Sequence, residues 1–322
     1  MKNLLKYFYE QLPKIENCLQ QEINSLSPLV KPVAQHILNA GGKRLRPVLC
    51  ILTAQAFGCR EDNVYPLAGA LELIHSATLL HDDVLDNAIM RRSQKAAHLI
   101  FGLKETILAG DALLARANQV VTTYHDTSLI SCVSEAIYQT AAGEILEIER
   151  MKQETLSFNE YLEIIMGKTG YLIQTCSQSG AILAKTGGPC QEAARIFGRN
   201  LGIAFQLVDD ALDYTVDHDS TGKPLGGDLR EGKLTLPLIM FLQTQDRKRQ
   251  QDLLDKIKER RLTEEEHLWI VDQVKNNELV SSTRQVAQKY LDLARHSLEQ
   301  FPSSSEKDLL NQVLEYIQTR EN

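Results

Sequence analysis

Two short stretches of the chain, HDDVLD and VDDALD, carry the same pattern D-D-x-x-D at the end of an apolar run. Their aspartates are Asp82, Asp83 and Asp86 in the first stretch and Asp209, Asp210 and Asp213 in the second. Side chains four positions apart lie on one face of a helix. Asp82 and Asp86 would therefore share a face with Thr78, and His75 would extend that face. Each helix would end its apolar face in carboxylates.

Clustered carboxylates repel one another and need cations nearby. Oxygen ligands suit Mg²⁺, which binds one or two carboxylates together with substrate phosphates and water. Two such helices facing each other would hold a diphosphate through magnesium. For one motif alone, a solvated helix end is an equal alternative, but two copies favour the diphosphate site. A calcium loop is a weaker explanation because its pattern D-x-[DN]-x-[DN]-G is missing.

Basic residues that could complete a diphosphate site occur at four places in the chain. They are Lys43 and Arg46 in GGKRLRP, Arg91 and Arg92 in MRRS, Lys168 next to Thr169, and Lys223 and Lys233 in a long loop. Glycines let the backbone approach an anion closely, and lysine and arginine supply a point charge and a bidentate fork. Any one of these cations alone is also typical of a surface turn. Together they match the charge of two bound anions.

The spacing of apolar residues predicts the elements that must position these groups. A period of 3.6 dominates and alternating β-branched runs are nearly absent, so we expect an all-α protein with about a dozen helices. Capping boxes predict helix starts at Ser157, Thr263 and Ser303. Residues 218–233 form the longest stretch rich in Gly, Pro, Asp and Ser, and no linker or repeat divides the chain. We expect one domain over residues 1–322.

Composition and charge exclude several classes of protein. A net charge of −7 argues against a general nucleic-acid binder, which would carry a basic patch. Six scattered cysteines without a C-x-x-C pair favour reduced thiols and a cytoplasmic location. The N-terminus lacks the pattern of a secretory signal, and no apolar run approaches about eighteen residues, the length that spans a membrane. Small molecules or proteins are the expected partners.

Several motifs, taken in order, resemble those of the trans-type (E-) polyprenyl diphosphate synthases, especially the medium- and long-chain, octaprenyl-like members. The motifs are GGKRLRP, ELIHSATLLHDDVLD, KTG and FQLVDDALDY followed by GKPLGGDLREGKLTLPLI, within residues 33–240. The chain departs from the family pattern at two places, where RRSQKAAH replaces R-R-G-x-P-T and KTG replaces K-T-A. Neither departure removes a charged ligand.

The resemblance implies a homodimer with the isoprenoid synthase fold, in which antiparallel helices surround a deep central cavity. It implies that isopentenyl diphosphate condenses with an allylic diphosphate, farnesyl or geranyl, through magnesium-assisted ionisation, condensation and proton elimination. In the resemblance, three Mg²⁺ ions would be bound by Asp82, Asp86 and Asp209, assisted by Asp83 and Asp213. The allylic diphosphate would be contacted by Arg91, Lys168 and Lys233, and isopentenyl diphosphate would be bound by Lys43, Arg46, His75 and Arg92. The allylic cation would be stabilised by Thr169 and Gln206. Lys223 would add a further cation for the substrates.

The prenyl chain is expected to grow along the helix that carries the first motif. One helical turn rises about 5.4 Å, close to one isoprene unit, so a bulky residue one turn before Asp82 would stop growth. Ala77 and Thr78 stand there, where short-chain members of the family typically have an aromatic residue. We expect a product of roughly six to ten isoprene units, as for a quinone side chain. A short-chain geranylgeranyl or farnesyl diphosphate synthase is the alternative.

Two other functions share part of this pattern. A terpene cyclase also uses D-D-x-x-D, but typically lacks GGKRLRP and carries N-D-x-x-S/T-x-x-x-E in place of the second motif. A noncatalytic subunit of a heteromeric synthase normally loses aspartates, whereas both motifs are intact here. The sequence therefore favours chain elongation.

Overall fold

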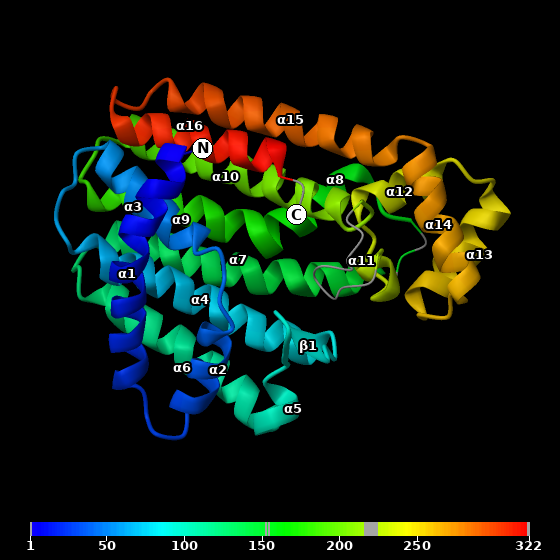
Figure 1. Ribbon diagram of the computed structural model, residues 1–322, viewed down its shortest axis with the longest axis horizontal. Coiled ribbons are helices and arrows are strands. Elements are labelled where there is room, and N and C mark those ends of the chain that lie inside the picture. Colours follow the sequence, from blue (N-terminus) through cyan, green and yellow to red (C-terminus); the bar gives the residue numbers. More distant parts are fainter. Residues whose placement is uncertain (1, 152, 154, 216–224, 321–322) are drawn as a thin grey trace. The chain divides into compact units, whose positions relative to one another are not determined.

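The computed structural model describes residues 2–151, 153, 155–215 and 225–320, and most of them are helical (Figure 1). The α-helices are α1 (Lys2–Ser25), α2 (Lys31–Asn39), α3 (Leu45–Ala56), α4 (Val64–Leu85), α5 (His98–Phe101), α6 (Leu103–Thr122), α7 (Thr127–Met151), α8 (Phe158–Ile165), α9 (Tyr171–Leu183), α10 (Gly188–Leu212), α11 (Gly227–Arg230), α12 (Leu236–Gln243), α13 (Arg247–Lys258), α14 (Glu264–Asn276), α15 (Leu279–Leu298) and α16 (Ser305–Thr319). A π-helix, η1 (Met166–Gly170), lies between α8 and α9, and a hairpin pairs β1 (Met90–Arg91) with β2 (Gln94–Lys95). The predicted all-α class is confirmed.

The chain forms two compact units. Unit 1 comprises Met1–Ile137, Leu172–Gly198 and Ser297–Val313, and unit 2 comprises Tyr138–Tyr171, Arg199–His296 and Leu314–Asn322. Helices α7 and α10 each begin in unit 1 and end in unit 2. The single domain expected from the sequence stays a prediction.

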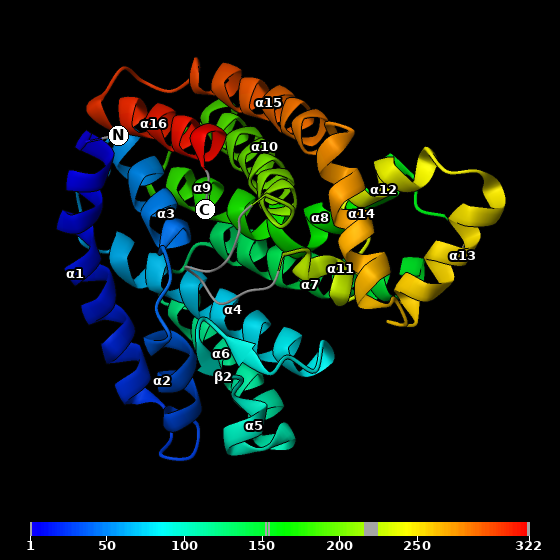
Figure 2. The ribbon, with the colours of Figure 1, turned by 45° about the vertical axis from the view of Figure 1, so that its right-hand side comes forward.

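Helix α4 is the central element of unit 1 and is apolar almost all round. It contacts α1, α2, α3 and α6, and Figure 2 shows α2 beside α1 within this unit. Leu71, Leu73 and Leu80 of α4 are fully buried. Replacing one such leucine with alanine costs about 2–5 kcal/mol of stability, because a cavity remains. The core of unit 1 thus holds rigidly the helix that ends in the first aspartate motif.

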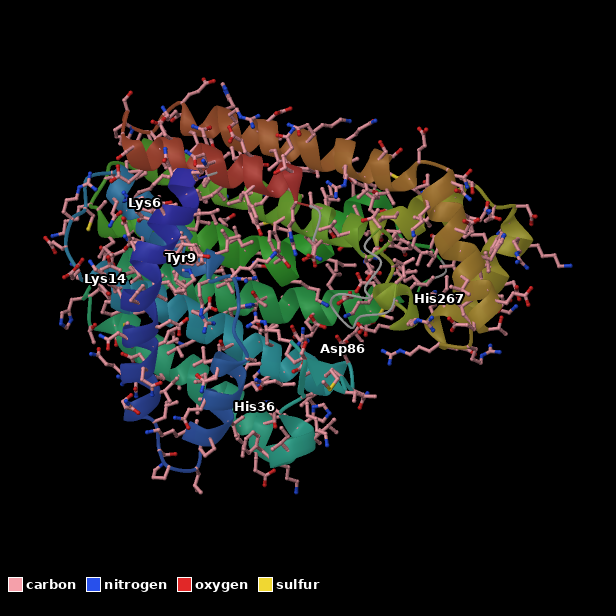
Figure 3. The ribbon with its side chains drawn as sticks, in the orientation of Figure 1. Lys6, Tyr9, Lys14, His36, Asp86 and His267 are labelled. Atoms are coloured by element: carbon pink, nitrogen blue, oxygen red, sulfur yellow. The ribbon has the colours of Figure 1, made fainter. Side chains whose placement is uncertain are left out.

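Helices α12, α13 and α14 pack together within unit 2. Helix α12 contacts both α13 and α14, and Phe241 of α12 meets Trp269 of α14 edge to face with ring centroids 5.5 Å apart. His267 of α14, labelled in Figure 3, is buried and hydrogen-bonds the carbonyl of Gly226 at 3.0 Å. This contact fixes the residue that precedes α11.

Two of the three predicted helix starts are confirmed and one is displaced. Complete capping boxes form at Ser157 of α8 and Thr263 of α14. At α16 the predicted box on Ser303 is wrong, because Ser304 accepts the capping hydrogen bond from the backbone N–H of Lys307 at 3.1 Å. The Glu306 carboxylate, expected in that box, instead pairs with Arg60 at 2.5 Å.

None of the helices in the described part of the chain combines the length and the apolar character needed to cross a membrane.

Candidate active site

The first aspartate motif occupies the last turn of α4, with Asp86 as the C-cap residue (Figure 3). Asp82 and Asp86 are half-buried, whereas Asp83 is completely buried. The Oδ1 atom of Asp83 accepts from Arg91 Nε at 2.7 Å and lies 2.5 Å from Arg91 Nη2. The middle aspartate is therefore neutralised inside the protein. The outer two remain on the half-buried face.

A tight hairpin returns Arg91 to Asp83. Its loop residues, Arg92 and Ser93, both have positive φ angles, 49° and 63°, and Arg91 pairs with Gln94 across it. Two positive φ angles in succession are typical of a two-residue hairpin loop. Glycine would adopt the position of Ser93 without strain. RRSQKAAH therefore folds into a defined turn despite its departure from the family pattern.

The three cations of GGKRLRP have different environments. Arg44 is buried, with a φ of 43°, and it pairs with Glu72 at 2.8 Å and Glu16 at 2.7 Å. Lys43 is exposed. Arg46 is half-buried at the start of α3, and its buried Nε makes no hydrogen bond. Arg44 therefore serves the fold, while Arg46 keeps bonding capacity for a ligand.

His75 lies close to several guanidinium groups of unit 1. Burial holds the pKa of His75 well below its usual value, and Arg46, Arg92 and Arg91 lower it further. Arg92 also donates a hydrogen bond to the carbonyl of Gly41. Burial is the largest cause of this shift, and the guanidinium groups add positive charge around the ring. A bound anion would offset this charge.

The two predicted chain-length positions differ in their surroundings. Ala77 is completely buried, and Thr78 is half-buried and donates a hydrogen bond to the His75 carbonyl at 2.8 Å. Thr78 stands four residues before Asp82, on the same face of α4. Their effect on product length stays a prediction.

The second aspartate motif ends α10 in unit 2. The side chain of Asp209 is 48% exposed, and its Oδ1 lies 2.9 Å from Nη1 of Arg320, which follows α16. The carboxylate of Asp213 accepts from the backbone N–H groups of Gly227 and Asp228 at 3.1 and 3.0 Å. Asp213 thus caps the N-terminus of α11 from outside that helix.

Asp210, the middle aspartate of this motif, is buried within a chain of hydrogen bonds. Tyr161 Oη donates to Asp210 Oδ2 at 2.5 Å, and Gln206 Nε2 donates to Asp210 Oδ1 at 2.8 Å. Thr169 Oγ1 in turn donates to Gln206 Oε1 at 2.7 Å. Burial, and then the charge of Asp228, raise the pKa of Asp210 to about 7, although the hydrogen bonds from Tyr161 and Gln206 lower it. The predicted pair Thr169 and Gln206 is thus in direct contact.

Lys168 is held by two glutamates for which the sequence offered no role. Its Nζ pairs with Glu147 and lies 3.3 Å from Glu144 Oε2, both on α7. Burial alone would lower the pKa of Lys168, but Glu147 and Glu144 outweigh it and the pKa is raised. Lys168 is therefore a fixed positive charge. A signal was present in the sequence, because Glu144 and Glu147 are three residues apart and share a helix face.

The π-helix η1 displays Lys168 and Thr169. Single-turn π-helices occur often at functional sites. Helix α7 approaches η1 so closely that a Cβ on Gly143 would lie 2.5 Å from the Cα of Gly167. At the position where KTG departs from K-T-A, the side chain of Met166 fills the space, since a Cβ on Gly170 would meet its sulfur at 2.4 Å.

Of the two lysines predicted in the long loop, Lys233 and Lys223, the structure describes only Lys233. Lys233 is half-buried, and its Nζ lies 2.6 Å from Glu231 Oε2. It also lies close enough to Lys168 to lower the pKa of that group. Lys223 lies outside the described residues.

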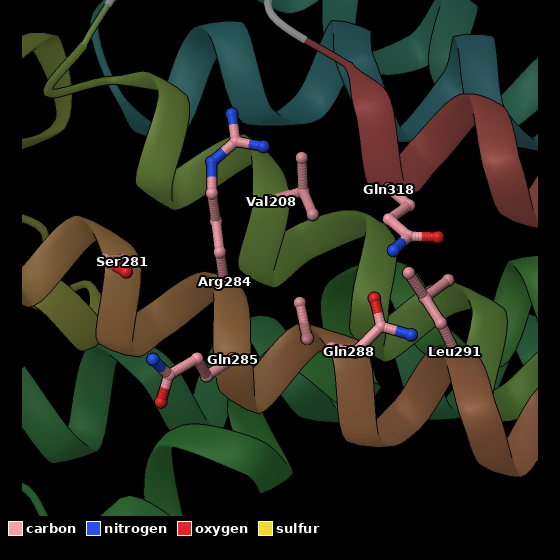
Figure 4. Close-up of a pocket in the computed structure, with 8 residues that line it drawn as sticks. Val208, Ser281, Arg284, Gln285, Gln288, Leu291 and Gln318 are labelled. Atoms are coloured by element: carbon pink, nitrogen blue, oxygen red, sulfur yellow. The ribbon is translucent and has the colours of Figure 1, made fainter.

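A pocket of about 270 Å³ lies behind the second motif within unit 2. Figure 4 shows Arg284 and Gln288 of α15 at this pocket, with Val208 of α10 and Gln318 of α16. Arg284 donates to the carbonyl of Arg320 at 3.0 Å. Arg284, which lines the pocket, therefore holds the backbone of Arg320, the residue whose guanidinium pairs with Asp209.

The carboxylates suit magnesium only in company with a phosphate ligand. No group of three His, Cys, Asp or Glu side chains in the described ranges is arranged to hold a metal ion. Mg²⁺ commonly takes one or two carboxylates and completes its shell with phosphate and water. Asp82 and Asp86, one turn apart, offer such a pair in unit 1, and Asp209 offers a carboxylate in unit 2.

Comparison with known proteins identifies the family of this arrangement. A family model described as polyprenyl synthetase matches residues 27–274. An octaprenyl diphosphate synthase of Escherichia coli is 36% identical over 230 residues, which cover 71% of each chain. The crystal structure of a polyprenyl synthase from Caulobacter crescentus, complexed with calcium and isoprenyl diphosphate, superposes with a TM-score of 0.93 at 34% identity and covers 100% of this chain and 98% of that one. A geranylgeranyl pyrophosphate synthetase from Pyrococcus horikoshii gives a TM-score of 0.91 at 29% identity and 99% coverage of both chains.

Proposed function

The chain belongs to the polyprenyl synthetase family and is a prenyltransferase, and we propose that it joins isopentenyl diphosphate to farnesyl or geranyl diphosphate to make a long-chain all-trans polyprenyl diphosphate. One observation carries the proposal. The helices α4 and α10 each end in D-D-x-x-D with outer carboxylates that reach solvent, and Arg46 and Arg92 lie close enough to His75 to supply a separate anion site.

In the proposed reaction, Asp82, Asp86 and Asp209 bind Mg²⁺, three ions in all, with Asp213 assisting. Asp83 would assist only indirectly, through its ion pair with Arg91. Bound magnesium would neutralise the diphosphate as it leaves the allylic substrate. The cations that meet the departing diphosphate are Arg91, Lys168 and Lys233. Lys168 suits this role because Glu144 and Glu147 fix its position, and a preorganised charge costs no reorganisation during the reaction.

Isopentenyl diphosphate would occupy the anion site of unit 1. Lys43, Arg46, His75 and Arg92 are its proposed contacts, and the buried Nε of Arg46 that lacks a hydrogen bond supports this assignment. Thr169 and Gln206 would direct oxygen atoms at the allylic cation. Water would quench that cation, so the prenyl-binding cavity must be lined by apolar side chains.

The length of the product is a separate proposal. The tail would extend along α4 past Thr78 and Ala77, neither of which is aromatic. This favours a long product, as does the similarity to an octaprenyl diphosphate synthase. A short-chain product is the alternative, because the chain is also similar to a geranylgeranyl synthetase.

We further propose that the enzyme is a homodimer in the cytoplasm. Large apolar side chains are exposed on α6, namely Leu103, Ile107 and Leu108, and on α7, namely Tyr138, Ile145 and Ile148. Exposed apolar side chains that gather on a protein surface mark sites of contact with another protein. All six cysteines are free thiols, which supports a reducing compartment.

The test is incubation of the purified protein with isopentenyl diphosphate, farnesyl diphosphate and Mg²⁺, followed by chromatography of the dephosphorylated products. A ladder that ends at one long prenol and disappears with a chelator is the expected result. A folded protein that gives no product with any allylic primer would contradict the proposal and indicate a noncatalytic subunit.

A further inference from the structure

The hydrogen-bond chain that runs from Tyr161 through Asp210 and Gln206 to Thr169 has a fixed direction. Gln206 Nε2 donates to Asp210 Oδ1, and Gln206 Oε1 accepts from Thr169, so the amide NH₂ faces Asp210 and the amide oxygen faces Thr169. Thr169 has one hydroxyl proton, which it must give to that oxygen. The remaining lone pairs of Thr169 Oγ1 therefore point away from Gln206. Reversing the amide would break both contacts of Gln206.

Tyr161 completes the environment that keeps Asp210 an acceptor. Its hydroxyl donates to Asp210 Oδ2, whereas Gln206 occupies Oδ1, so each carboxylate oxygen has a donor. Burial raises the pKa of Tyr161, which keeps its hydroxyl protonated at neutral pH. Tyr161 and Asp210 are both almost completely buried. Neither side chain is placed to exchange partners with solvent.

We propose that Asp210 and Tyr161 are positioning residues for prenyl transfer, which orient the Gln206 amide so that Gln206 and Thr169 present oxygen lone pairs to the allylic cation. This inference rests on the proposed function. It assigns Asp210 a role other than metal binding, although Asp210 belongs to the second D-D-x-x-D motif. Preorganised dipoles stabilise developing charge without reorganising during the reaction.

Asparagine at position 210 distinguishes orientation from mere packing. It preserves the shape of aspartate, but its NH₂ group can donate to the oxygen of Gln206. The reversed amide then becomes as favourable as the native one, and a positive N–H end faces Thr169. The expected result for Asp210→Asn is a fall in kcat of about tenfold to a hundredfold, with KM for both diphosphates nearly unchanged.

Tyr161→Phe removes one donor and leaves the ring in place. Because Asp210 still holds Gln206, a smaller fall in kcat of about threefold to tenfold is expected. Tyr214→Phe is the matched control, since Tyr214 is completely buried in unit 2 and its Oη lies 3.5 Å from Thr235 rather than on Asp210. Its kcat should equal that of the wild type.

A double-mutant cycle tests whether Asp210 acts through Gln206. In a Gln206→Leu background, Asp210→Asn should cause little further loss, because the group that it orients is gone. Losses that multiply in the double variant would overturn the proposal and give Asp210 an independent role.

Two binding and spectroscopic readouts do not depend on catalysis. Magnesium-dependent binding of inorganic pyrophosphate, measured by calorimetry, should survive Asp210→Asn and fail in Asp209→Asn. Equal losses in the two variants would make Asp210 a metal ligand and overturn the proposal.

In proton NMR, a Gln206 amide proton, assigned by its absence in Gln206→Leu, should lie downfield in the wild type and move upfield in Asp210→Asn. An unmoved signal would overturn the proposed orientation. A wild-type protein with the expected NMR signal but no prenyl transfer would instead contradict the proposed function and, with it, the catalytic role of the pair.

Discussion

The two D-D-x-x-D motifs have identical spacing but different partners inside the protein. The middle aspartate of the first, Asp83, is completely buried against Arg91. The middle aspartate of the second, Asp210, is buried without an arginine and accepts hydrogen bonds from Tyr161 and Gln206. One is an ion pair that stabilises a hairpin, and the other orients a neutral amide. Equal spacing therefore does not imply equal roles.

The outer positions differ as well. In the second motif Arg320 meets Asp209 and two backbone N–H groups bind Asp213, whereas Asp82 and Asp86 of the first motif are half-buried on one face of α4. We infer that metal binding depends on the outer residues in both motifs.

The residue one turn before each motif also differs. Thr78 stands four residues before Asp82, and Phe205 stands four residues before Asp209, where its ring lies 5.1 Å from the Arg320 guanidinium. An aromatic ring already occupies this position on α10. This favours α4 as the helix along which a prenyl chain would extend.

The largest expected effect tests the outer aspartates. Asp82→Asn and Asp209→Asn should each lower kcat by about a thousandfold, because an amide oxygen is a poor substitute for a charged ligand to Mg²⁺. Steady-state prenyl transfer at saturating substrate measures this. Thermal unfolding should stay near that of the wild type. Full activity in either variant would remove that residue from the metal site.

Asp83→Asn should instead reduce stability. It leaves the guanidinium of Arg91 beside a neutral buried side chain, at a cost of about 1–3 kcal/mol. Urea denaturation of the variant beside Asp82→Asn measures the difference. Equal stability of the two variants would contradict the assignment of Asp83 to the hairpin.

Thr78→Phe should shorten the product, because the ring would stand one turn before Asp82 on the face of the diphosphate. Chromatography of the dephosphorylated products measures chain length. Ala77→Phe should also shorten it, if that position borders the tail. Phe205→Thr on α10 is the control and should leave the length unchanged. A product that lengthens in the control would place the tail along α10.

Arg320→Gln tests the constraint on Asp209. Arg320 competes with metal for this carboxylate, so its removal should tighten magnesium-dependent pyrophosphate binding by about threefold, the effect expected of a partly exposed ion pair. Arg230→Gln removes an exposed pair with Glu264 and serves as control. Weaker binding in Arg320→Gln would mean that Arg320 supports the site.

The smallest expected effect concerns His75 in unit 1. Burial and then the surrounding arginines hold its pKa low, so the imidazole is neutral at pH 7. A bound anion offsets the guanidinium charges and favours the imidazolium form, so pyrophosphate should raise the pKa of His75. NMR titration of the ring protons measures the shift. An unchanged pKa would place the anion elsewhere.

Helix type and the positions of both motifs could be predicted from the sequence because they depend on local spacing. The pairing of Asp83 with Arg91 could not, since it depends on the register of a hairpin whose loop residues have positive φ angles. The π-helix η1 could not be predicted either, because a sequence pattern of period 3.6 does not distinguish it from an α-helix. Arg320 lies in a C-terminal segment that carried no recognisable motif, so its contact with Asp209 was not foreseen.

The central claim is that the outer aspartates bind metal and the middle ones do not. Calorimetric titration of pyrophosphate with and without Mg²⁺, on single Asp→Asn variants at positions 82, 83, 86, 209 and 210, tests it directly. We predict that magnesium no longer tightens binding in the variants at 82, 86 and 209 and still does so at 83 and 210. Equal loss in all five variants would contradict this division of roles. It would mean that the shared D-D-x-x-D spacing predicts metal binding better than the contacts of each aspartate do.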